Sequence, residues 1–363
     1  MNNRNVYIAI PVMDEPQTAS FLRRLALQTR LPYMVVVCVN QPKKFWDNEG
    51  KRHIAETNVR VLKELQMLIG GALPFTVEII DCCTVGTDEK HIGVGWARKY
   101  ALDFIDARAV SDDIMIWMDA DTVYPDNYIE EVVKVFEQDT RILALTAPYY
   151  HLIEGFDERR VEGHSPEIDI RQQIAATGHF SEMMMYDDFS KQQQIAALHY
   201  EVYMRAYLIN LYRSGHPYAF TAIGSGIAST VKAYRKAGGL TPVKSGEDFY
   251  FIQKLFKTGK VIAWCNTVCN PSIRASNRVF FGTGPAISKG LADDWKSYPI
   301  YPFSLFEKIG SIYQEFGKLW DCEKFDRQSI ITKTDLQKFQ TNARTKEQFV
   351  KFCTEKFDAL RTL

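Results

Sequence analysis

The alternation of short apolar runs with helical segments over the first 150 residues constrains the fold most. Five runs have the length and composition of β-strands, and apolar positions between them recur with helical spacing. The strand runs are apolar throughout, which is typical of a parallel sheet covered on both faces. We therefore predict an α/β fold built on an open, mostly parallel sheet. The expected strands are residues 6–12, 34–39, 75–80, 114–118 and 142–146.

The rest of the chain predicts three further segments. Residues 151–215 begin with a charge-rich stretch and close with a long helix before Gly215, so we expect a helical insertion. Residues 216–275 return to an α/β pattern. Residues 276–363 contain a turn-rich loop and then helical apolar stripes, which predicts a helical C-terminal tail.

Charge and hydropathy exclude several classes of protein. Lys and Arg together number 44, as do Asp and Glu, and this zero net charge argues against a protein whose main task is to neutralise nucleic acid. No apolar stretch approaches the roughly 20 residues of a membrane-spanning helix. The apolar run at residues 6–10 is too short for the core of a signal peptide. We expect a cytoplasmic protein, free or at the inner face of the membrane.

Two acids one residue apart follow the fourth expected strand. Asp119 and Asp121 would lie at the carboxyl end of that strand, where open α/β sheets bind ligands. Two carboxylates there repel each other unless a cation lies beside them, and their hard oxygens suit Mg²⁺ or Mn²⁺ on a diphosphate. The alternative is that Asp121 caps the following helix, because acids are favoured at a helix start.

A second acidic pair opens a helix in the α/β segment that follows the insertion. Gly246 precedes Glu247 and Asp248, and Gly259 is the expected end of the helix. Capping alone explains acids at this position. If Asp248 instead faces the edge that carries Asp119, its ionised carboxylate can take a proton from a hydroxyl group. The sequence leaves both explanations open.

Four segments in order make the chain resemble family 2 glycosyltransferases, which have the GT-A fold. They are residues 11–15, the Gly-x-Gly-x-Ala-Arg segment at 93–98, the Asp-x-Asp at 119–121, and a Gly-Gly…Glu-Asp pattern spanning 238–248. The resemblance implies one GT-A domain over residues 1–275. Its expected parts are a nucleotide half at 1–150, the helical insertion at 151–215 and an acceptor half at 216–275, followed by the C-terminal loop and helical tail at 276–363.

The resemblance implies an inverting transfer of one sugar from a UDP- or GDP-sugar to an acceptor hydroxyl. Asp119 and Asp121 would hold Mn²⁺ or Mg²⁺ on the diphosphate, Asp248 would deprotonate the acceptor, and Glu247 would help to position it. The Gln-x-x-Arg-Trp motif of processive synthases is lacking, so single additions are expected. The expected acceptor is a glycan or a lipid-linked glycan in surface glycan synthesis, with no nucleic-acid partner and with peripheral membrane contact open to the tail.

The same resemblance implies further contacts with the donor. Many members hold the base with an aspartate after the second strand; Asn40 stands there, and Asp81 is expected to share the task. Arg98, Arg274 and Arg278 are expected to face the phosphates or the acidic pair, since guanidinium groups pair with phosphate oxygens. Each of these arginines can instead be an ordinary surface residue. The expected nucleotide-sugar-binding residues are Pro11, Glu15, Asn40, Asp81, Arg98, Asp119, Arg274 and Arg278.

Two other functions remain open at this point. A metal-dependent nucleotidyltransferase shares the sheet and the paired acids, but it would carry a Gly-rich, basic loop after the first strand, where residues 13–16 are Met-Asp-Glu-Pro. A binding protein on an inactive transferase fold would not depend on Asp248.

Overall fold

The predicted apolar runs form buried strands of one sheet, at residues 6–12, 114–117 and 142–146, in the computed structural model. The structure describes residues 4–69, 71, 73–151, 189–243, 245–276, 278–280, 282–321 and 332–358. The chain divides into a sheet unit, Met1–Glu201 with Ala222–Tyr298, and a helical unit, Val202–Thr221 with Pro299–Leu363. Most of the predicted insertion, at residues 152–188, lies outside the described residues.

Seven strands form the sheet within the described residues, in the order β3-β2-β1-β4-β6-β5-β7. Strand β6 runs antiparallel to both β4 and β5, and the other neighbours are parallel. The predicted open, mostly parallel α/β sheet is therefore confirmed. The strands are β1 (Val6–Val12), β2 (Met34–Pro42), β3 (Thr76–Thr87), β4 (Ile114–Trp117), β5 (Ile142–Thr146), β6 (Ile227–Thr230) and β7 (Lys260–Ile262).

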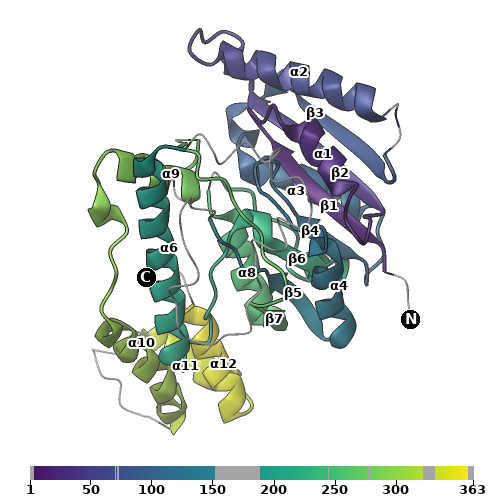
Figure 1. Ribbon diagram of the computed structural model, residues 1–363. Helices are drawn as coiled ribbons and strands as arrows, with labels where there is room; N and C mark the ends of the chain where they lie inside the picture. Colours follow the sequence, from purple (N-terminus) through teal and green to yellow (C-terminus); the bar gives the residue numbers. More distant parts are fainter. Residues whose placement is uncertain are drawn as a thin grey trace. The chain divides into compact units, whose positions relative to one another are not determined.

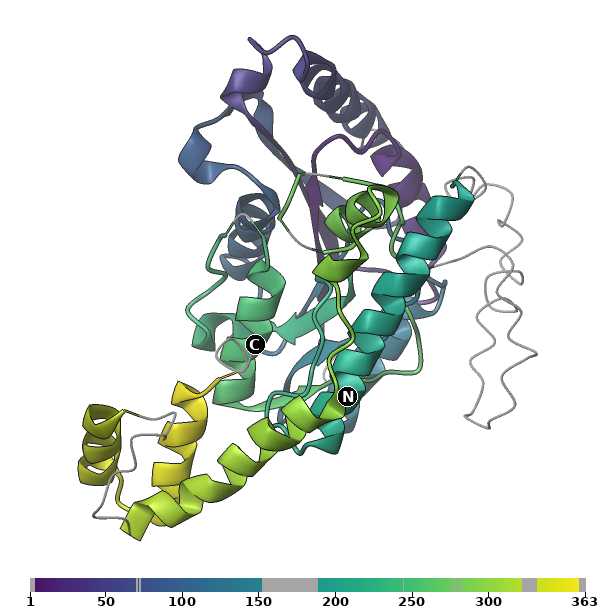
Figure 2. The same cartoon turned by 90° about the vertical axis from the view of Figure 1, so that its left-hand side faces the viewer.

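Helices cover both faces of this sheet, as the fully apolar strands require (Figures 1 and 2). Helices α1 and α2 pack together, and α2 contacts β3. Helix α3 packs on β1 and β2, and its Asp103 accepts a 2.5 Å hydrogen bond from the Tyr234 hydroxyl of α7. The helices of the sheet unit are α1 (Thr18–Leu25), α2 (Arg52–Ile69), α3 (Val94–Asp106), α4 (Tyr128–Gln138), α7 (Val231–Lys236), α8 (Glu247–Thr258), α9 (Thr283–Leu291) and the first half of α6 (Lys191–Arg213).

The helical unit has its own apolar core. Besides the second half of α6 it contains α10 (Phe303–Glu315), α11 (Lys333–Asn342) and α12 (Lys346–Lys356), so the expected helical tail is present. Phe316, Leu336 and Phe349 are buried together in its core. Across the ranges that the structure describes, none of the helices combines the length and apolar character that a bilayer crossing needs.

His216 is a buried imidazole of the helical unit. Its Nδ1 accepts the backbone N–H of Tyr218 at 3.0 Å, and its Nε2 lies 3.4 Å from the Tyr313 hydroxyl. Burial lowers the pKa of His216 to about 4, because the charged form loses its hydration.

Acid should therefore weaken the fold through His216. Below pH 6.5 the imidazole of His216 is protonated in the unfolded chain but stays neutral in the folded chain. The unfolding free energy therefore falls between pH 6.5 and about 4, by up to about 3 kcal/mol. Urea unfolding of the full chain should show a flatter pH dependence in His216→Gln than in wild type, and an unchanged profile in the exposed control His53→Gln. Equal profiles in His216→Gln and wild type would contradict this role.

Gly95 allows α3 to approach the segment that precedes α8. A Cβ atom at Gly95 would overlap the backbone oxygen and nitrogen of Val243. Because backbone cannot rotate away, Gly95→Ala should lower stability by about 1–3 kcal/mol, although alanine is the better helix former by about 1 kcal/mol. Thermal unfolding checks this. Gly50→Ala is the control, since a Cβ there makes only an ordinary contact with Asn48. Equal melting temperatures for both variants would show that α3 can shift.

Candidate functional site

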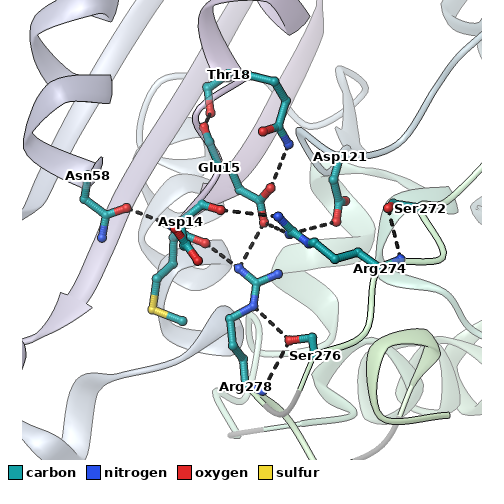
Figure 3. Close-up of polar contacts among 11 residues, drawn as sticks. Asp14, Glu15, Thr18, Asn58, Asp121, Ser272, Arg274, Ser276 and Arg278 are labelled. Atoms are coloured by element: carbon teal, nitrogen blue, oxygen red, sulfur yellow. Dashed lines mark hydrogen bonds and ion pairs between the residues drawn. The ribbon is translucent and has the colours of Figure 1, made fainter. Parts of the chain in front are cut away.

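Strands β1 and β4 are parallel neighbours, so the residues that follow them meet at one edge of the sheet. Glu15 comes from the loop after β1 and is 6% exposed. Arg274 Nη2 lies 2.5 Å from Glu15 Oε1 and 3.3 Å from Asp121 Oδ2. Arg278 Nη1 lies 3.0 Å from the same Glu15 oxygen and also donates to the backbone oxygen of Met13. Figure 3 shows both arginines pointing toward Glu15.

A chain of buried amides fixes the loop after β1. Asp14 has a left-handed conformation, with φ 60°, and its N–H donates to Asn58 Oδ1 at 2.8 Å. Asn58, on α2, donates to Gln41 Oε1 at 2.7 Å, and Gln41 donates to the backbone oxygen of Cys83 at 2.9 Å. Neither Asn58 nor Gln41 was among the predicted site residues. Uncharged amides carry no pattern that marks such a role, and α2 itself was not predicted.

Arg98 is 1% exposed and connects β4 to α8. Its Nη2 lies 2.7 Å from Asp119 Oδ1, its Nη1 pairs with Glu247 Oε1, and its guanidinium carbon is 5.1 Å from the centre of the Trp117 ring. Burial alone would lower the pKa of Arg98, but Asp119 and Glu247 hold it above its ordinary value. The alternative of an ordinary surface arginine is therefore wrong.

Helix α8 brings the second acidic pair to this site. Gly246 has φ 80°, a left-handed conformation that glycine adopts without strain, so the helix can begin directly with Glu247. Asp248 is half-buried, its Oδ1 accepts the N–H of Phe249 at 2.8 Å, and its charge interacts with Arg98 and Asp119. Asp248 thus contacts the first turn of its helix and lies within electrostatic range of Arg98 and Asp119.

Burial raises the pKa of Asp121, Glu247 and Asp248. The pKa of Asp121 rises to about 7, first through burial and then through Glu15, while Arg274 opposes the rise. The pKa of Glu247 rises to about 7 through burial, opposed by Arg98. Helix α4 begins at Tyr128 with Asn127 at its N-cap, so the alternative that Asp121 caps this helix is wrong.

Three other residues predicted at the donor site have contacts within the protein. Pro11 is half-buried in β1. Asn40 donates to the backbone oxygen of Gly93 at 3.3 Å and so links β2 to the start of α3. Asp81 accepts hydrogen bonds from Cys83 and Thr84, and these hold its pKa below the ordinary value although burial would raise it.

The carboxylate oxygens at this site are suitable ligands for a divalent cation. Five carboxylates (Glu15, Asp119, Asp121, Glu247 and Asp248) share the site with three guanidinium groups, so the acids outnumber the cations. Within the described ranges no group of three or more His, Cys, Asp or Glu residues could hold a metal by itself. Mg²⁺, however, is commonly held by one or two carboxylates together with substrate phosphates and water. Asp119 and Asp121 are a suitable pair for that arrangement.

Residues 76–209 match the family model for glycosyl transferase family 2. The matched segment includes Arg98, Asp119 and Asp121. The match confirms the predicted resemblance to family 2 glycosyltransferases over this segment. A sequence comparison with curated proteins finds no match.

Several solved structures are similar to the chain at low identity. TarS from S. aureus is 12% identical, with a TM-score of 0.40. The match covers 97% of this chain but only 55% of TarS. Glucosyl-3-phosphoglycerate synthase from Mycobacterium tuberculosis is 13% identical, with a TM-score of 0.42 over 83% of this chain and 82% of that one. A mannosyltransferase from Pyrobaculum calidifontis is 12% identical, with a TM-score of 0.39 over 97% of this chain and 87% of that one.

Replacing Arg98 should lower the unfolding free energy, because its two carboxylate partners then lack a counter-charge. Arg98→Met leaves Glu247 and Asp119 without their counter-charge, and we expect a loss of about 3–5 kcal/mol in unfolding free energy. Adding Glu247→Gln removes one of those charges, so the double variant should be more stable than Arg98→Met alone.

Denaturant unfolding measures both effects. Arg23→Met, at an exposed position of α1, is the matched control and should change stability by about 0.5 kcal/mol or less. A double variant as unstable as the sum of the two single variants would show that Arg98 and Glu247 do not depend on each other.

Proposed function

We propose that the chain is a metal-dependent glycosyltransferase that moves one sugar from a UDP- or GDP-sugar to an acceptor hydroxyl, with inversion. The observation that carries the proposal is the arrangement around Arg98, where Asp119 from the end of β4 and Glu247 from the start of α8 share one guanidinium beside Asp248. Family 2 membership of the segment that holds Asp119 and Asp121 favours this function over nucleotidyl transfer.

Asp119 and Asp121 would hold the metal at the diphosphate. When bound, Mn²⁺ or Mg²⁺ stabilises the negative charge that gathers on the departing nucleoside diphosphate. Arg274 and Arg278 lie at the same edge and present planar donors that pair with phosphate oxygens. In the free protein these arginines are held by Glu15, which places them at the site before a donor binds.

Asp248 is the proposed base. The oxygen of the acceptor hydroxyl attacks the sugar from the side opposite the diphosphate, and a carboxylate oxygen of Asp248 accepts the proton that this hydroxyl loses. Its partial exposure gives an acceptor access to it. Glu247 is 3% exposed and pairs with Arg98, so we propose that it positions Arg98 and its neighbours rather than contacting the acceptor. The acceptor class that we propose is a glycan or a lipid-linked glycan.

A donor screen with two variants tests the proposal. Release of UDP or GDP should require Mn²⁺ or Mg²⁺. Asp248→Asn should keep donor binding and lose turnover by about 10²–10⁴-fold, because the base is removed while the donor site remains. Asp121→Asn should weaken metal-dependent donor binding measured by calorimetry.

Asp112→Asn, at an exposed position before β4, is the matched control and should leave both properties unchanged. Full turnover in Asp248→Asn would show that another group is the base. Stabilisation of the wild-type protein by nucleoside triphosphates, with no response to any UDP- or GDP-sugar, would favour a nucleotidyltransferase. Donor binding without turnover on any acceptor would favour a binding protein.

A further inference from the structure

The two arginines of the proposed donor site lie in one loop, here called the arginine loop (residues 271–282). Both ends of this loop are hydrogen-bonded to the short segment that contains Tyr150 and His151. At its start, Asn270 pairs with Val123 and donates to the backbone oxygen of Tyr150 at 3.0 Å. The N–H of Tyr150 in turn donates to the backbone oxygen of Cys269 at 3.0 Å. The first end of the loop is thus fixed at Tyr150.

The other end of the loop is fixed by the next residue, His151. Its Nε2 lies 2.9 Å from the hydroxyl oxygen of Thr283, the first residue of α9. Its Nδ1 lies 2.6 Å from Glu201 Oε1, and its backbone N–H donates to the same oxygen at 2.7 Å. His151 and Glu201 are both buried, at 3% and 6% exposed. One carboxylate therefore fixes the backbone and the ring of His151 together.

Hydrogen bonds connect Thr283 to Arg278. The backbone oxygen of Gly284 accepts the N–H of Ser276 at 3.2 Å. The hydroxyl of Ser276 accepts the N–H of Arg278 at 3.3 Å and its Nε–H at 3.1 Å, and Arg278 then reaches Glu15 (Figure 3). The start of α9 thus sets the position of Ser276, and Ser276 sets the direction of Arg278.

The apolar side of the loop leads back to the same helix that carries Glu201. Ile273 is fully buried against Ala196 and Ala197 of α6 and against Ile287 of α9. Its neighbour Arg274 points to the acidic edge instead. Helix α6 therefore supports the loop at two places, through Ile273 and through Glu201 and His151.

We propose that His151 is a positioning residue of the donor site. Held by Glu201, it fixes Thr283 and thereby orients Arg278, and with it the arginine loop, toward the diphosphate. The nature of the ligand rests on the proposed function, whereas the anchoring of the loop does not. The sequence gives no sign of this role, because His151, Glu201 and Thr283 are far apart in the chain and share no motif.

Hydrogen exchange measured by mass spectrometry tests the anchoring without any substrate. Thr283→Val removes the hydroxyl and keeps the shape, so amide exchange in peptides covering Ser276 and Arg278 should become about tenfold faster. Thr283→Ser keeps the hydroxyl and should exchange like wild type. Thr57→Val, on α2, is the control for a lost threonine hydroxyl elsewhere. Unchanged exchange of the loop in Thr283→Val would overturn the proposal.

Nucleotide binding tests the consequence. UDP and GDP with Mn²⁺ should bind about five- to tenfold more weakly to Thr283→Val than to wild type. Because Thr283 acts through Arg278, Thr283→Val should add almost nothing in an Arg278→Gln background. Fully additive losses would overturn the proposed route. If wild type binds neither nucleotide, the proposed function fails, and the exchange experiment alone decides whether His151 anchors the loop.

Discussion

The buried guanidinium of Arg98 is the interaction on which the site depends. Removing a cation from water is costly unless counter-charges surround it, and Asp119 and Glu247 supply them. Glu247 is buried and Asp119 is half-buried, so both carboxylates depend on the arginine in return. This mutual dependence connects the end of β4 to the start of α8, which is 130 residues further along the chain, and it keeps Asp248 within electrostatic range of Asp119 at the proposed metal site.

The sheet could be predicted because its strands depend on burial alone. Strands β1 and β5 match the predicted bounds, since a run buried on both faces must be apolar throughout. Strand β3 continues to Thr87, well past the predicted end at residue 80. Its last seven residues mix polar and apolar types and are mostly exposed or half-buried, so no apolar run marks them in the sequence. Helix α2 was missed although its buried residues recur with helical spacing, so its sequence did carry the signal; these residues are Ile54, Ala55, Asn58, Val61, Leu62 and Leu65.

The candidate site could be predicted only in part. Acids that follow a strand or begin a helix are typical of the sheet edge where α/β proteins bind ligands, so Asp119, Asp121 and Asp248 could be predicted as site residues. The sequence could not show that Arg98 is buried, because an arginine within a helix pattern is normally exposed. Asn58 and His151 act through single hydrogen bonds between segments distant in the chain, and no local pattern specifies such contacts.

Glu15 gives the donor edge an internal competitor. In the free protein its carboxylate already occupies the two guanidinium groups that a diphosphate would use. Under the proposed function, a diphosphate would displace this carboxylate, so its net affinity would be the difference between two sets of charge-assisted hydrogen bonds rather than the full strength of one. The same exchange would run in reverse when the nucleotide leaves, since Glu15 would pair with the two arginines again. A side chain that weakens binding in this way would hasten turnover wherever product release limits the rate.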